Sequence, residues 1–500
     1  MKPFRLSILL MILMSMMGAK SFAHDIEVAN ADGVTIYYLW NDNKTELIVS
    51  FRGEWYPEIY TDRYTGHITI PESVEYNGST YNVTSIGTGA FNGCNNLTSV
   101  SIPNSITKIE DHAFYNCSGL NSITIPNSVT NIGRFAFAEC SELTSVIISN
   151  SVATIEDYTF YHSRNLTSVT IPSSVMTIGN QAFGGCRNLT SITISNGLVS
   201  IGRYAFSWCT NLASIMIPNS VTSIGDCAFD KCSSLTSITI PSSVTSIGYN
   251  IFGRCSSLAS IKVDEKNTIY DSRNNSNAII ETVNNTLISG CMNTVIPTSV
   301  TNIGYQAFSG CDNLKSVTIP DSVTSIGFEA FRDCISLTSI TIPSSVTSIE
   351  SYAFSGFSNL TSVTIPNNVT IIEYSTFRDC NSLTSVTIGN NVSKLDEYVF
   401  AGCVSLTSVT SLNSAPPKMV SNTFDNYAAL LQVPIGTKTK YQKTIYWRNF
   451  KNIEEIDPAS VQNITLEKGK NTPIYDLNGR KLESPKKGIN IVGGKKVVMK

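Results

Sequence analysis

Cysteine and histidine are the residue types in this sequence that could bind a metal ion or supply a nucleophile. The 500 residues include 13 cysteines and four histidines. No thiols are grouped at a CxxC-like spacing and no histidines form an HExxH pair, so a zinc site is not predicted. The sequence also lacks a GxSxG nucleophile elbow with a histidine partner and a GxxxxGK phosphate-binding loop. We therefore predict that the protein is not an enzyme and binds no cofactor or metal ion.

The spacing of the cysteines favours packing over chemistry. Eleven of them, from Cys94 to Cys403, occupy one position of a 23-residue pattern, whereas Cys227 and Cys291 lie outside it. In an exported chain the odd number could mean disulfides plus one reactive thiol. However, the same position also accepts Ser163 and Phe357, which favours a buried column of small side chains. We expect most of the thiols to be free.

Aromatic side chains are the main candidates for ligand contact, because rings with polar groups are enriched in binding hot spots. The candidates lie between the Gly and Ala positions of the 23-residue unit and are Phe135, Tyr158, Tyr204, Tyr249, Tyr305, Phe328, Tyr352, Tyr374 and Tyr398. The alternative is that these rings cover the repeat core against solvent. A ladder of serines from Ser99 to Ser408 is a second polar surface, and Trp208 would suit a sugar ring.

These residues must be positioned by an internal repeat. A phenylalanine recurs every 23 residues from Phe91 to Phe252 and again from Phe308 to Phe400, and a leucine follows each one six positions later. The unit reads LTSVTIPxSVTSIGxxAFxxCxx. A fixed period of this length, with apolar residues at set offsets, indicates a leucine-rich solenoid whose units bury their apolar side chains by stacking.

Each part of the unit predicts a local structure. LTSVTIP alternates apolar and hydroxyl residues as a half-buried strand does, and the proline, as in Pro103, ends it. AFxxCxxL spaces its apolar residues three to four apart and predicts a short helical turn. The predicted fold is therefore an α+β repeat solenoid. It would be a leucine-rich repeat arc with parallel strands on the concave face, short helical turns behind and β-rich caps.

From residue 83 to about 412 the motif IPxSVTSIGxxAFxxCxxLTSV recurs nearly verbatim. At this pattern the sequence resembles the BspA-type leucine-rich repeats of surface proteins of anaerobic bacteria and some parasitic protists. The resemblance implies a secreted or cell-surface binding protein, with an adhesin for host or neighbouring-cell surface and matrix proteins as the expected function. Departures at the proline position occur at Ser149, Ser195, Asp264 and Gly389. Two alternatives stay open: an extracellular polysaccharide-binding protein and an envelope scaffold protein.

The two ends of the chain predict export. Residues 1–23 combine basic residues, a short apolar run and a small-x-small ending at Ser21 and Ala23, which is typical of a secretory signal peptide. The apolar run is too short for a spanning helix, so no membrane span is expected in the mature chain. Residues 459–500 form a basic tail of short strands. The tail resembles the type IX sorting or surface-anchoring signals of exported bacterial proteins, and a purely structural β tail is the alternative.

The regions flanking the solenoid are expected to be β-rich. Residues 24–82 are predicted to form an N-terminal β cap and residues 413–458 a degenerate C-terminal cap. Within the solenoid, residues 83–412, the period breaks once, and the irregular insert 262–294 holds two apolar runs joined by Asn284 and Asn285. These runs predict a hairpin, either as an irregular unit or as a dedicated binding excursion.

The charge distribution limits the classes of partner. The formal net charge of −3 is made of +3 in residues 1–23, +6 in residues 459–500 and −12 in the chain between them. Nucleic acid is therefore not expected as a partner, because phosphate binding needs clustered Lys and Arg. An acidic surface favours basic or polar ligands instead, with proteins the expected partners and glycans the alternative.

Overall fold

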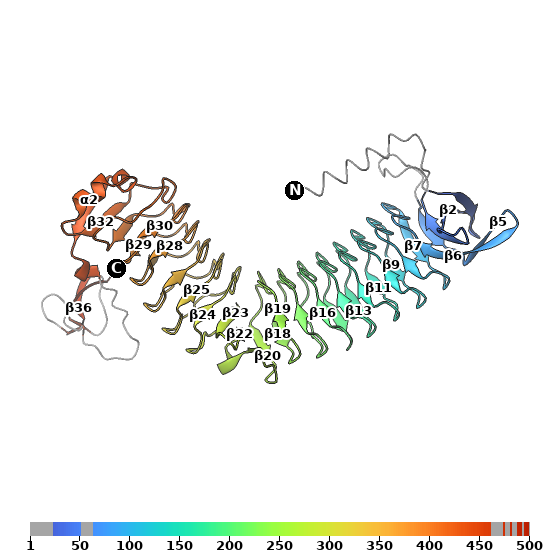
Figure 1. Ribbon diagram of the computed structural model, residues 1–500, viewed down its shortest axis with the longest axis horizontal. Coiled ribbons are helices and arrows are strands. Elements are labelled where there is room, and N and C mark those ends of the chain that lie inside the picture. Colours follow the sequence, from blue (N-terminus) through green and yellow to red (C-terminus); the bar gives the residue numbers. More distant parts are fainter. Residues whose placement is uncertain are drawn as a thin grey trace. The chain divides into compact units, whose positions relative to one another are not determined.

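The computed structural model describes residues 24–51 and 64–461, together with the backbone of four short strands between residues 474 and 499. The predicted signal peptide at 1–23 lies outside the described residues. The chain divides into two compact units, Met1–Pro297 with Gly304–Leu314 and Thr298–Ile303 with Lys315–Lys500. Each unit contains a stack of 23-residue turns of a β-solenoid, in which the strands of successive repeats lie side by side (Figure 1).

The first side of the solenoid is a ladder of parallel strands formed by the LTSVTIP segments. In the first unit these strands are β7 (Leu97–Ser101), β9 (Ser122–Thr124), β11 (Ser145–Ile147), β13 (Ser168–Ile171), β15 (Ser191–Ile194), β18 (Ser237–Ile240) and β20 (Ser260–Val263). In the second unit they are β27 (Ser362–Thr364), β29 (Ser385–Ile388) and β31 (Ser408–Ser411). Equivalent residues pair across repeats, as Ser145 does with Ser168. Val146 is buried between the exposed Ser145 and Ile147, which confirms the predicted strand pattern.

The second side is a ladder of two-residue parallel strands, each ending in the isoleucine of SVTSI or, in β30, a leucine, and this residue is buried in every strand except β19. In the first unit these are β8 (Lys108–Ile109), β10 (Asn131–Ile132), β12 (Thr154–Ile155), β14 (Thr177–Ile178), β16 (Ser200–Ile201), β17 (Ser223–Ile224) and β19 (Ser246–Ile247). In the second unit they are β24 (Asn302–Ile303), β25 (Ser325–Ile326), β26 (Ser348–Ile349), β28 (Ile371–Ile372) and β30 (Lys394–Leu395).

The third side consists of turns, so the predicted helical turns and the α+β class are wrong. Residues two before and two after each core phenylalanine have left-handed backbones, as at His112 (φ 56°) and Asn116 (φ 54°), which interrupt a helix. The N–H groups of His112, Phe114 and Asn116 donate to carbonyls of the next repeat at 2.8–2.9 Å. Tight turns, and not helical turns, place the apolar residues three to four positions apart. In one of these turns the Cys117 N–H donates to the Phe114 carbonyl at 3.2 Å.

Two buried columns run through the stacked turns. The core phenylalanines stack nearly parallel, with Phe114 and Phe137 centroids 5.1 Å apart in the first unit and Phe354 and Phe377 5.3 Å apart in the second. None of the 13 cysteines, all of which lie in the described residues, forms a disulfide, and most of those in the column donate their thiols to the backbone, as Cys117 does to the Phe91 carbonyl at 3.0 Å. Ser163 replaces a cysteine because its hydroxyl makes the same bond, to the Phe137 carbonyl at 2.8 Å.

The first unit begins and ends with additional β structure. Before the repeats come β1 (Ile26–Ala29), β2 (Thr35–Trp40), β3 (Glu46–Ser50), β4 (Gly66–Thr69), β5 (Ser73–Tyr76) and β6 (Ser79–Ile86). Strand β4 pairs in parallel with β7, so the ITIP segment already belongs to the first ladder. The irregular insert contains β21 (Tyr270–Asp271), the 3-10 turn η1 (Arg273–Asn275), β22 (Ala278–Glu281) and β23 (Thr286–Gly290). Strands β22 and β23 are antiparallel, which confirms the predicted hairpin.

The second unit ends in a modified repeat. Strand β31 pairs in parallel with β32 (Leu430–Pro434), which pairs with β33 (Asn452–Ile456). Phe424 continues the ring column, 4.9 Å from Phe400. Here lie α2 (Lys438–Lys443), η2 (Trp447–Asn449) and η3 (Pro458–Val461). In the tail, β34 (Ile474–Tyr475), β35 (Lys481–Leu482), β36 (Gly488–Val492) and β37 (Lys495–Met499) form an antiparallel sheet.

Candidate binding surfaces

The nine aromatic candidates lie on the turn face, which is the surface formed by the turns around each core phenylalanine. They occupy two different repeat positions and not the single one expected from the sequence. Two residues before the core ring, with φ between 54° and 61°, are Phe135, Tyr158, Tyr204, Tyr352 and Tyr398. Three residues before the core ring are Tyr249, Tyr305, Phe328 and Tyr374. The two positions are close enough that rings from adjacent repeats meet, and the structure separates the nine into three groups.

The first group covers the turns near the start of the solenoid. His112 stacks on Phe135 with centroids 4.8 Å apart, and Phe135 stacks on Tyr158 at 4.5 Å. Burial lowers the pKa of His112, and this effect outweighs the opposite one of the Asp111 charge. His112 is not among the nine candidates predicted from the sequence, although its position two residues before Phe114 identifies it. Half-buried, parallel rings of this kind fit the alternative role of covering the core.

A second group, the C-terminal aromatic run, consists of Phe328, Tyr352, Tyr374 and Tyr398 on consecutive repeats. Neighbouring centroids are 5.7, 5.3 and 5.6 Å apart and the rings are inclined at 58–73°, so edges as well as faces are presented. Arg332 lies over Tyr352 and Arg378 over Tyr398, at 5.6 and 5.7 Å from the ring centres. A hydrogen bond with Tyr352 raises the pKa of Tyr374. The run thus combines ring edges, phenols and guanidinium groups.

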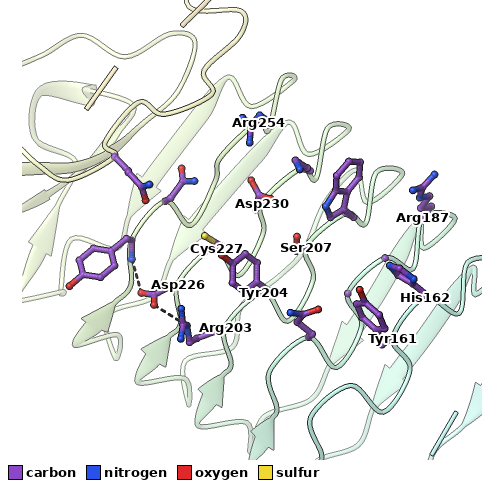
Figure 2. A pocket seen from close by; sticks show the side chains of 18 of the residues that line it. Tyr161, His162, Arg187, Arg203, Tyr204, Ser207, Asp226, Cys227, Asp230 and Arg254 are labelled. Carbon is purple, nitrogen blue, oxygen red and sulfur yellow. Dashed lines mark hydrogen bonds and ion pairs between the residues drawn. The ribbon is translucent and has the colours of Figure 1, made fainter. Parts of the chain in front are cut away.

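The third group, Tyr204, Tyr249 and Tyr305, lines a hollow of about 730 Å³ in the first unit (Figure 2). We call it the turn-face groove. It forms because the residue after the core phenylalanine changes from Tyr161 to the small Gly184 and Ser207 in the next two repeats. A further glycine, Gly185 (φ +77°), leaves room for the His162 ring, which a Cβ atom at this position would overlap unless the ring moved.

Charged side chains cluster along the groove. Arg203 Nε contacts Asp226 Oδ2 at 3.0 Å, and Asp226 Oδ1 accepts the Tyr249 backbone N–H at 3.0 Å. These bonds are the dashed lines in Figure 2. Trp208, which is 42% exposed, carries Lys231 Nζ at 3.8 Å from its ring centre and the Arg187 guanidinium at 5.6 Å. The tryptophan therefore holds two cations at the groove by cation–π attraction.

Asp230 is the most unusual side chain of the groove. It is 7% exposed, and its Oδ1 atom has no hydrogen-bond partner. Burial raises the pKa of its carboxyl, although Lys231, Arg254 and a hydrogen bond from Ser207 act in the opposite direction. A hydrogen bond with the Cys227 thiol raises the pKa of Tyr204 to about 12. Buried polar atoms without a partner are rare in folded proteins, so the free Asp230 oxygen marks a place where a ligand can bond.

The charged residues of this groove were not predicted from the sequence. Trp208 was proposed as a sugar platform, but the structure places two cations on its ring instead. Two features of the sequence could have indicated the groove: the small residues that follow the core phenylalanine in two successive repeats, and the charged residues in the adjacent repeats. Over residues 24–51 and 64–461, no three His, Cys, Asp or Glu side chains form a group that could hold a metal ion. Within the same residues, no helix is long and apolar enough to cross a bilayer.

Known proteins share this architecture. The BspA type leucine rich repeat region matches residues 69–190, 176–289, 285–407 and 371–478. The chain belongs to the BspA-type leucine-rich repeat family. A leucine rich cell surface protein from Faecalibacterium prausnitzii, known from a crystal structure, is 32% identical with a TM-score of 0.58. The alignment covers 77% of this chain and 95% of that one. The family membership confirms the resemblance inferred from the repeat motif.

Two further crystal structures show the same fold. A leucine-rich repeat protein from Bacteroides ovatus is 26% identical with a TM-score of 0.51, over 75% of this chain and 92% of that one. The pneumococcal vaccine antigen PcpA is 22% identical with a TM-score of 0.54, over 87% of this BspA-type chain and 99% of the antigen. No functionally curated protein matches the sequence.

Proposed function

We propose that the protein is a non-enzymatic, secreted or cell-surface binding protein that attaches to surface or matrix proteins of host or neighbouring cells. The observation that carries this proposal is the C-terminal aromatic run. Four aromatic side chains on consecutive repeats touch one another on the turn face, and two arginines lie over them. Clusters of Tyr and Arg are the residue types that dominate protein–protein hot spots.

Export supports this function. A signal peptide at residues 1–23 and a sorting or anchoring signal at residues 459–500 would deliver the repeats to the cell surface. The Faecalibacterium prausnitzii relative is described as a cell surface protein. Mostly buried thiols that form no disulfides fit an exported chain whose fold is stabilised by the stacking of the repeats.

The experiment compares two paired substitutions in the purified protein. Binding to immobilised collagen, laminin and fibronectin is measured by biolayer interferometry. Tyr352→Ser with Tyr374→Ser should weaken binding by about 1–2 kcal/mol or more for each true anchor. The matched control, Phe135→Ser with Tyr158→Ser, changes stacked rings in the other unit and should leave binding unchanged.

Two results would contradict the proposal. Full affinity after the Tyr352 and Tyr374 changes would move the contact away from the C-terminal aromatic run. If the unmodified protein binds none of these matrix proteins and no intact host-cell surface, a structural role in the envelope would replace adhesion.

A further inference from the structure

The turn-face groove is a basic site on an acidic chain. Four cationic side chains line it: Arg187, Arg203, Lys231 and Arg254. Two carboxylates, Asp226 and Asp230, face them. The groove therefore carries an excess of positive charge, whereas residues 24–458 have a net charge of −12. The negative charge on the rest of the chain repels anions, whereas the positive charge in the groove attracts them. The groove therefore favours small or extended anions that fit inside it.

Arg187 and Lys231 are positioned to bond an anion. They are held over the Trp208 ring rather than by a carboxylate, unlike Arg203, which pairs with Asp226. A cation–π contact leaves N–H groups at the periphery of the cation able to donate to oxygen. Carboxylate or sulfate oxygens are the acceptors that such donors bond most strongly.

The centre of the groove offers a hydrogen-bond acceptor to a ligand. Asp230 Oδ1 is buried and lacks a partner, while Ser207 and Arg254 lie on either side of this carboxyl (Figure 2). A simple anion would be repelled by this carboxylate. A ligand that carries hydroxyl groups beside its negative charges satisfies both the cations and Asp230.

The length and the rings of the groove fit an extended ligand. It spans six stacked repeats, from the one containing Tyr161 to the one containing Tyr305. At about 4.8 Å per strand spacing this is roughly 24 Å, enough for several sugar rings. At one end Tyr249 and Tyr305 are 58% and 43% exposed, with ring centres 4.7 Å apart. Exposed phenol rings present an apolar face with a polar edge, which suits the C–H face and hydroxyls of a pyranose.

We propose that the turn-face groove binds acidic oligosaccharides, whose sugars carry carboxylate or sulfate groups beside free hydroxyls. An acidic peptide fits less well, because the lining offers charged and hydroxyl groups and exposed rings but no apolar pocket for an anchoring side chain. This site is separate from the C-terminal aromatic run, so it holds or fails independently of the protein contact proposed above.

Calorimetric titration of the purified protein tests the ligand class. The probes are a hyaluronan hexasaccharide with carboxylates only, a κ-carrageenan hexasaccharide with sulfates only, neutral maltohexaose and hexaglutamate. At least one acidic sugar should bind, more weakly as salt rises, and about tenfold or more tighter than maltohexaose or hexaglutamate. The acidic sugar that binds more tightly shows whether the groove prefers carboxylate or sulfate groups. Equal binding of maltohexaose, equal binding of hexaglutamate, or no binding of either acidic sugar overturns the proposal.

Substitutions then test the location. Arg187→Gln with Lys231→Gln should weaken the acidic sugar about tenfold or more, since two charge-assisted bonds are lost. The matched control is Arg164→Gln, at the repeat position of Arg187 but one repeat earlier and outside the groove. It should change the affinity by no more than about twofold. An equal loss in the control would show attraction to overall charge and would overturn the site.

A third variant separates a sugar site from a simple positive patch. Asp230→Ala removes a negative charge, so a patch that attracts anions only by charge would bind the sugar more tightly. If Asp230 accepts a sugar hydroxyl, the variant should bind about threefold or more weakly instead. Circular dichroism and the melting temperature establish that each variant is folded. If Asp230→Ala does not fold, Asp230→Leu is measured in its place. Tighter binding of the acidic sugar by the folded variant overturns the proposed contact between Asp230 and a sugar hydroxyl.

Discussion

Truncating Phe229 to alanine tests whether the stacked rings hold the first unit together. The Phe229 ring is fully buried, with the rings of Phe206 at 5.6 Å and Phe252 at 5.8 Å on either side. Truncating a core phenylalanine usually costs about 3–5 kcal/mol, because apolar burial is lost and a cavity remains. Two ring contacts, each worth about 0.5–1.5 kcal/mol, are lost as well. We therefore expect a loss near the upper end, about 4–5 kcal/mol in the free energy of unfolding.

Urea denaturation followed by circular dichroism measures this loss. Because each repeat contacts only its neighbours, the cavity should also weaken the coupling between the repeats on either side and broaden the transition. The control is Tyr249→Ala, which truncates a ring that is 58% exposed and should cost about 0.5 kcal/mol or less. A loss below about 1 kcal/mol for Phe229→Ala, or equal losses in the two variants, would refute the assignment of the ring column as the core.

Three further predictions concern the thiols, a buried acid and the tail. Thiol titration of denatured, unreduced protein should find most of the 13 cysteines free; a low count would mean that disulfides stabilise the fold. Asp230 has a raised pKa when folded, so stability falls as pH rises above the ordinary value of 3.8 through the folded-state pKa. Asp230→Asn should therefore raise the melting temperature at pH 7 but not at pH 3, and a gain that persists at pH 3 would exclude ionisation as its cause. Deleting residues 459–500 should leave the purified protein folded while the cells lose it from their surface, as immunofluorescence would show; retained display would argue against a sorting signal.

Much of the fold could be predicted because it depends on repetition alone. The LTSVTIP strands, the buried ring column and the hairpin of β22 and β23 are all present as predicted. In each case the decisive information is local: alternating polarity, a fixed spacing, or an Asn pair between two apolar runs. Stacking then requires that equivalent residues pair across repeats, as Val169 does with Ile192.

The turns could not be predicted from spacing, because tight turns and a helix both place residues three to four apart on one side. The choice between them is made by the neighbouring repeat, which accepts the Phe114 and Asn116 N–H groups. A helix would use those groups within its own segment, so the inter-repeat bonds favour a backbone with left-handed residues. In this turn conformation the aromatic candidates occupy two different repeat positions, two and three residues before the core phenylalanine.

By itself, the sequence determined the 23-residue period, the apolar columns and the family, since each follows from residue types at fixed offsets. Only the tertiary structure decided what gathers on the turn face. Stacking brings Arg187, Trp208 and Lys231 together although they lie in three different repeats. It also buries Asp230 without a partner for Oδ1. Residues 21 to 23 positions apart, as these are, become neighbours only when successive turns align, so a groove formed across repeats depends on packing.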